Sequence, residues 1–116
     1  MYWLAVFVTV LIAALHVVIF WMETLAWESK RVRAIFDTDI AFAARSKDLA
    51  GNQGVYNLVF ALMLAAGLIL ANLQLLVIVL AGIMVVGLYG AATVSSRILY
   101  IQALPAGVGI MSWVLA

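Results

Sequence analysis

One histidine and one glutamate lie seven residues apart in an otherwise apolar segment near the N-terminus, His16-Val-Val-Ile-Phe-Trp-Met-Glu23. On an α-helix this spacing places both side chains on one face, about 20° apart around the axis and roughly 10 Å apart along it. An imidazole and a carboxylate are common proton-transferring groups in proteins. Because the spacing is too long for a direct hydrogen bond, joint acid–base chemistry requires a substrate or a water between them.

Further polar side chains interrupt the later apolar segments. A charged side chain at the centre of a bilayer costs about 2.5–3.5 kcal/mol, so such groups normally face a protein interior or a water-filled cavity. We take His16 and Glu23 as candidate catalytic residues. The predicted ligand-binding set contains these two residues and six others: Gln53, Asn57, Tyr89, Thr93, Arg97 and Gln102. The same residues have a structural interpretation, since polar groups between membrane helices contribute about 0.6 kcal/mol each on average.

The composition indicates an integral membrane protein. Of the 116 residues, 69% are hydrophobic and only 9% are charged, whereas soluble domains are about 45–50% apolar and about 25% charged. The mean hydropathy of +1.26 agrees. The net charge of +1 gives no reason to expect a nucleic-acid partner. With no cysteine and a single histidine, the sequence predicts neither a metal site nor a cofactor.

The apolar segments predict an all-α fold, a four-helix membrane bundle forming one domain over residues 1–116. About 20 apolar residues cross a bilayer. Residues 55–93 would make a helix roughly 58 Å long, so they must fold back, and Asn72-Leu-Gln74 is the most polar place for a turn. Ser95-Ser96-Arg97 marks the next turn. The predicted spans are about 3–27, 55–71, 75–94 and 98–116, and the first is expected to be retained rather than cleaved as a signal.

Residues 28–53 form the polar connection after the first span. Asp39 is a predicted cap for a short helix that begins at Ile40 and ends at Gly51, and Asn52 is predicted to cap the second span. Two interpretations of residues 34–50 remain open. They form either a helix at the membrane surface or a solvated loop with a few apolar anchors.

The basic residues predict an orientation. Five of them lie in the first connection and one in the third, namely Lys30, Arg31, Arg33, Arg45, Lys47 and Arg97. The positive-inside rule then puts these connections in the cytoplasm and both termini outside, as expected for a multi-pass protein of a bacterial inner membrane. In this orientation the eight predicted site residues lie in the inner half of the membrane and line a pocket that faces the cytoplasm.

Two further patterns concern packing. Gly87, Ala91 and Ser95 form a small-residue stripe that lets helices approach closely, either within one chain or in a homo-oligomer. Pro105 is expected to kink the fourth span.

Four blocks carry a family resemblance: His16…Glu23…Trp27, Asn52-Gln-Gly-Val-Tyr-Asn57, Tyr89-Gly-Ala-Ala-Thr93 and Gln102-Ala-Leu-Pro-Ala106. With these blocks the chain resembles domain of unknown function 1304, a small bacterial membrane-protein family. The resemblance covers nearly the whole chain and implies four membrane spans. It implies no activity.

Three functions fit this pattern. In the first, the protein binds or transports a small amphipathic molecule, with Glu23 or His16 exchanging a proton. In the second, it is a membrane-embedded, isomerase-like enzyme that uses His16 and Glu23 as an acid–base pair on a lipidic substrate. In the third, it is a structural or accessory subunit. The expected partners are the lipid bilayer, a second copy of the chain and a small amphipathic ligand.

Overall fold

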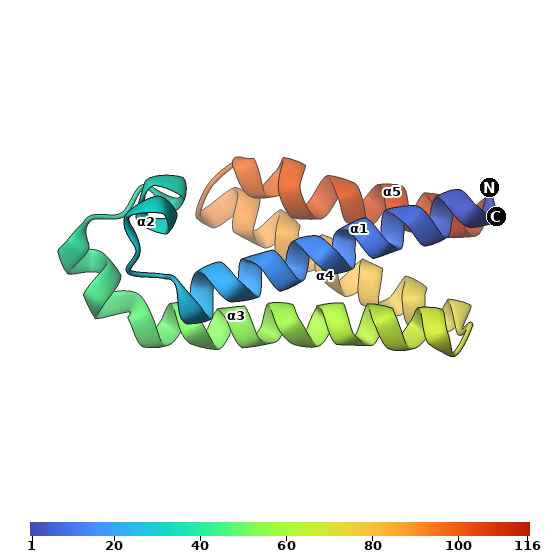
Figure 1. Cartoon of the computed structure of the whole chain (residues 1–116). Coiled ribbons are helices and arrows are strands. Elements are labelled where there is room, and N and C mark those ends of the chain that lie inside the picture. The colour runs from blue at the N-terminus through green and yellow to red at the C-terminus, as the bar shows by residue number, and fades with distance from the viewer. The chain divides into compact units, whose positions relative to one another are not determined.

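The computed structural model describes all of residues 1–116 and contains helices but no strands (Figure 1). Helix α1 (Tyr2–Phe20) continues into a π-helical turn, η1 (Trp21–Leu25). The short α2 (Lys30–Phe36) and the long α3 (Ile40–Ile69) follow. Helix α4 (Leu73–Thr93) is followed by a second π-helical turn, η2 (Leu99–Ala103), and by α5 (Leu104–Val114). The predicted all-α fold is therefore confirmed.

Three helical segments are long and apolar enough to cross a membrane: Tyr2–Leu25, Ile40–Ile69 and Leu73–Thr93. Large apolar side chains are exposed along all three, among them Phe7, Leu62 and Val85. Such apolar surfaces are unfavourable in water and are matched by acyl chains, which indicates a membrane protein. The apolar helix Leu99–Val114 is shorter than these three segments.

The chain divides into two compact units, one formed by Met1–Ala14 with Phe60–Ala116 and the other by Leu15–Val59. In the first unit, Leu64, Leu76, Leu80 and Ile83 are fully or almost fully buried. Helices α4 and α5 run antiparallel (Figure 1). They pack closely because Gly87 has no side chain. A Cβ at this position would lie 2.8 Å from the backbone nitrogen of Ala103.

Both termini of the chain lie at one end of this first unit, where the turn between α3 and α4 also lies (Figure 1). The Tyr2 and Trp113 rings meet edge to face with their centroids 5.6 Å apart. At the turn, Ala71 adopts a positive φ of 50°. The Asn72 side chain then caps α4, since its Oδ1 accepts a hydrogen bond from the Leu75 backbone N–H at 2.9 Å. The chain thus folds back at the position that the sequence indicates.

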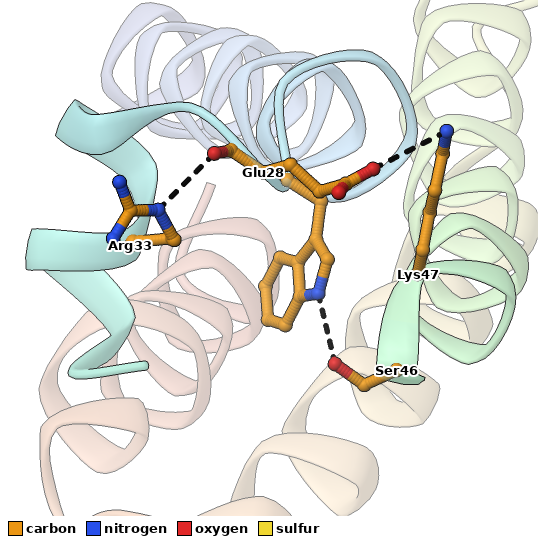
Figure 2. Close-up of polar contacts among 5 residues, drawn as sticks. Glu28, Arg33, Ser46 and Lys47 are labelled. Atoms are coloured by element: carbon orange, nitrogen blue, oxygen red, sulfur yellow. Dashed lines mark hydrogen bonds and ion pairs between the residues drawn. The ribbon is translucent and has the colours of Figure 1, made fainter. Parts of the chain in front are cut away.

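In the second unit, hydrogen bonds order the connection between η1 and α3 (Figure 2). The Glu28 carboxylate pairs with Lys47 Nζ at 3.3 Å, and its backbone carbonyl accepts a hydrogen bond from Arg33 Nε at 3.1 Å. The Trp27 indole N–H donates to Ser46 Oγ at 3.0 Å. Residues 30–36 and 40–50 are helical rather than a loop, and these bonds join both helices to the residues that follow η1.

The predicted end of a helix at Gly51 is wrong. Asp39 does cap the helix that begins at Ile40, accepting from the Phe42 N–H at 2.7 Å, but this helix runs on to Ile69. Asn52 therefore lies inside α3 and caps nothing. A glycine inside a helix costs about 1 kcal/mol relative to alanine, which is too little to end a helix whose later turns are well packed.

The expected kink at Pro105 takes a different form. Pro105 stands at the start of α5, directly after η2, within the continuous helical path Leu99–Val114. The chain before it forms the π-helical turn η2, in which the Leu104 N–H donates to the Leu99 carbonyl. The wider turn accommodates the proline without breaking the helical path.

Candidate functional site

Glu23 is a buried carboxylate in the π-helical turn η1. Its side chain is 7% exposed, and its Oε1 accepts a hydrogen bond from Asn57 Nδ2 of α3 at 2.7 Å. This turn closes the C-terminal end of the first helix, where the Ala26 N–H donates to the Trp21 carbonyl. The sequence predicted both residues for the site, and the structure brings them into direct contact.

The orientation of the Asn57 amide follows from its two hydrogen bonds. Besides the bond to Glu23, Nδ2 donates to the backbone carbonyl of Gln53 at 3.1 Å. An amide nitrogen donates whereas an amide oxygen only accepts. Since both partners are acceptors, they fix which end of the amide faces Glu23.

Gly54 sets how closely α3 approaches η1. A Cβ there would meet Thr24 Oγ1 and would lie 3.1 Å from both Glu23 Cβ and the Phe20 carbonyl oxygen. The Thr24 hydroxyl donates to the Gly51 carbonyl at 3.0 Å, joining the same two elements. Residue size at position 54 therefore controls whether Asn57 can reach Glu23.

His16 belongs to the same unit as Glu23 and is fully buried, with 0% of its surface exposed. Both ionisable groups of the first span are therefore shielded by protein. This burial agrees with the cost of leaving such groups among acyl chains.

The other predicted site residues have different surroundings. Tyr89 is 72% exposed. Thr93 is also exposed, and its hydroxyl donates to the Tyr89 carbonyl of its own helix at 2.7 Å. Arg97 is exposed and Gln102 is partly buried. These four residues belong to the first unit, whereas His16, Glu23, Gln53 and Asn57 belong to the second. Within the predicted set, the structure shows a side-chain contact between Glu23 and Asn57.

Two open grooves lie in the first unit, with volumes of about 470 Å³ and about 230 Å³. Neither is lined by a predicted site residue. The larger is lined mostly by apolar side chains of α4, η2 and α5, including Met84, Leu88, Leu104 and Met111. The apolar lining of these grooves suits acyl chains or apolar side chains rather than a polar ligand.

Two residues that shape the site, Thr24 and Gly54, were not predicted from the sequence. The available signal was the presence of Gly51 and Gly54 in a helix, where glycine is unfavourable unless another element comes close. Sequence analysis also missed the contact between Thr9 and Trp113 in the first unit, where the indole N–H donates to the buried Thr9 hydroxyl at 2.9 Å. No three His, Cys, Asp or Glu residues gather where they could hold a metal ion.

Comparison with known proteins identifies a family. The family model described as "Protein of unknown function (DUF1304)" matches residues 10–114, nearly the whole chain. No curated protein and no solved structure matches the chain.

Proposed function

The chain belongs to this family of unknown function, and we propose that it is a multi-pass membrane protein that binds or transports a small amphipathic molecule at Glu23. The buried contact between Glu23 and Asn57 carries this proposal. A carboxylate offers about four lone-pair positions, and the amide occupies one of them. The remaining capacity is available to a ligand or to an exchanged proton.

The position of the contact also supports a binding role. Glu23 lies two residues before the end of the apolar segment Tyr2–Leu25. On α3, Gln53 is exposed and Asn57 is half-buried. An amphipathic molecule in the lipid headgroup region would meet Gln53 first and then the carboxylate, while its apolar part stayed among acyl chains.

For the membrane arrangement, we propose four spans in a bacterial inner membrane, with both termini outside and residues 28–53 and the turn at 94–97 on the cytoplasmic side. The fourth span would be Leu99–Val114 with its flanking residues. The distribution of basic residues supports this orientation. The close packing of Gly87 on Ala103 supports a fourth helix beside the third.

The proposal is tested by equilibrium binding to the full-length protein in phospholipid nanodiscs. The probes are three radiolabelled molecules that share a phenylethyl body: 2-phenylethylammonium, its trimethylammonium analogue and 3-phenylpropionate. At least one is expected to bind saturably, and Glu23→Gln is expected to weaken that binding at least about tenfold, the loss of one charged hydrogen bond. Glu28→Gln is the matched control, because Glu28 is an exposed carboxylate five residues further on.

The result that contradicts a binding function is equally clear. If no probe binds saturably, or if Glu23→Gln lowers the melting temperature and changes nothing else, Glu23 serves only to hold η1 against α3. Uptake of a bound probe into proteoliposomes under a pH gradient, compared with protein-free liposomes, then separates transport from binding alone.

An acid–base enzyme is the second candidate, because His16 and Glu23 are both buried in one unit. In that case the bound molecule would be converted, and product analysis after incubation with the wild-type protein would detect an isomer. His16→Gln would then abolish conversion while leaving binding in place.

A further inference from the structure

The hydrogen-bonding positions of Glu23 and Asn57 that remain unused are acceptors. Asn57 Nδ2 has two N–H groups, and they point to Glu23 Oε1 at 2.7 Å and to the Gln53 carbonyl at 3.1 Å. Its donors are thus used, whereas Asn57 Oδ1 takes part in neither bond. The carboxylate of Glu23 is an acceptor at both oxygens when ionised. A ligand at this site meets acceptors from two elements and no spare donor on the amide.

Glu28 holds two of the basic side chains of this unit. Lys47 pairs with Glu28, and the Arg33 guanidinium donates to the Glu28 carbonyl. A carboxylate that is only 7% exposed is costly to keep ionised without a counter-charge. A cation that entered from the membrane surface would supply both the counter-charge and the missing donors.

On these grounds we propose that the ligand of the Glu23 site is an amphipathic cation that carries N–H groups, a primary or secondary ammonium. This inference rests on the proposed binding function and names its ligand class. An ammonium N–H donates to the Glu23 carboxylate and to Asn57 Oδ1, and the resulting charge-assisted bonds are roughly twice as strong as neutral ones. A quaternary ammonium has the charge but no N–H, and a carboxylate ligand has neither.

The three phenylethyl probes separate these chemistries on the unaltered protein in nanodiscs at neutral pH. The 2-phenylethylammonium ion is expected to bind saturably. The trimethylammonium analogue, with the same charge and body, is expected to bind about tenfold more weakly or not at all, and 3-phenylpropionate is not expected to bind. Glu23→Gln is expected to remove ammonium binding, whereas Glu28→Gln retains it.

Each other outcome overturns a defined part of the argument. Equal binding of the two cations disproves the N–H requirement and leaves a carboxylate site for cations. Binding of 3-phenylpropionate alone disproves the cation preference but leaves an amphipath-binding protein. Ammonium binding that survives in Glu23→Gln disproves the site. Binding of none of the three overturns the proposed function as well. Since the probe comparison uses the wild-type chain, a folding defect of a variant cannot mimic these results.

Discussion

Two glycines three residues apart on α3 have very different surroundings, and this difference gives a prediction at the residue scale. Gly54→Ala would place a Cβ on Thr24 Oγ1 and 3.1 Å from Glu23 Cβ, so it is expected to lower the free energy of unfolding by about 1–3 kcal/mol. Gly51 has nothing within 4 Å of a Cβ. Gly51→Ala is therefore expected to raise that free energy by up to about 1 kcal/mol.

Denaturant titration in mild detergent, followed by circular dichroism, measures both glycine variants. The wild-type chain and Gly51→Ala serve as references for any general effect of adding a methyl group to α3. Equal stability of the two variants would mean that α3 does not approach η1 at Gly54, and the contact between Asn57 and Glu23 would lose its basis.

A second residue-scale prediction concerns the buried hydroxyl of Thr9. It donates to the Ala5 carbonyl at 2.8 Å and accepts from the Trp113 indole at 2.9 Å. Thr9→Val keeps the shape but leaves the indole N–H without its acceptor. A loss of about 0.6–1.7 kcal/mol is expected, from the average to the largest value measured for hydrogen bonds between the helices of a membrane protein. Thr93→Val is the control, because the exposed Thr93 hydroxyl bonds only within its own helix. Unfolding curves in which Thr93→Val loses as much as Thr9→Val would contradict the prediction.

The sequence shows which polar residues are expensive in a membrane, but it does not show which of them meet. Glu23 and Asn57 stand out because almost all their neighbours are aliphatic. Glu23 lies in a π-helical turn at Trp21–Leu25. No local sequence pattern in this apolar segment predicts such a turn. The burial of Trp113 was missed for a related reason. A tryptophan near a helix end is typical of a membrane interface, whereas its actual partner lies at Thr9, far away in the sequence.

At the element scale, the approach of α4 to η2 depends on Gly87. A Cβ at position 87 would lie 2.8 Å from Ala103 N and 3.1 Å from Ala103 Cα. Backbone atoms cannot rotate away as a side chain can, so Gly87→Ala is expected to cost about 1–3 kcal/mol. On the same helix, a Cβ at Gly82 would meet only Phe60 Cε1, at 4.0 Å. Gly82→Ala should therefore be neutral or slightly stabilising in the same denaturant assay, and a harmless Gly87→Ala would contradict this helix pairing.

Helix starts were readable from the sequence, but helix ends were less so. Asp39 and Asn72 each accept a hydrogen bond from the backbone N–H three residues later, a local interaction that depends on residue type. Gly51 looked like a helix end by the same local logic. Gly51 instead lies inside α3. The helix continues past it because later residues pack against distant parts of the sequence, as Gly54 does against Thr24. The small residue Gly87 of the predicted stripe is used within the chain.

For the whole molecule, composition was the most informative feature. In a chain with 69% hydrophobic residues, a membrane covers the apolar side chains, and helices satisfy the backbone hydrogen bonds there. The structure is helical apart from its turns. Of the eight polar residues predicted to line one pocket, four belong to each unit, and spacing along the chain does not tell which of them meet.

The proposed transmembrane arrangement makes the last prediction. The chain has no cysteine, so single cysteines can be introduced without a background signal. Four exposed positions suit this purpose: Ala34, Gln74, Ser96 and Ala116. None carries a charge, which leaves the distribution of basic residues intact.

With the basic connections inside, a membrane-impermeant maleimide should label Gln74→Cys and Ala116→Cys in intact cells, but Ala34→Cys and Ser96→Cys only in inside-out vesicles. Labelling of Ala116→Cys from the same side as Ser96→Cys would mean that the short apolar helix Leu99–Val114 does not cross, because a segment anchored on one side exposes both of its ends there. Labelling of Gln74→Cys and Ser96→Cys from one side would remove α4 as a span. Labelling of Ala34→Cys in intact cells would overturn the assignment of the Glu23 end of the first span to the cytoplasmic surface.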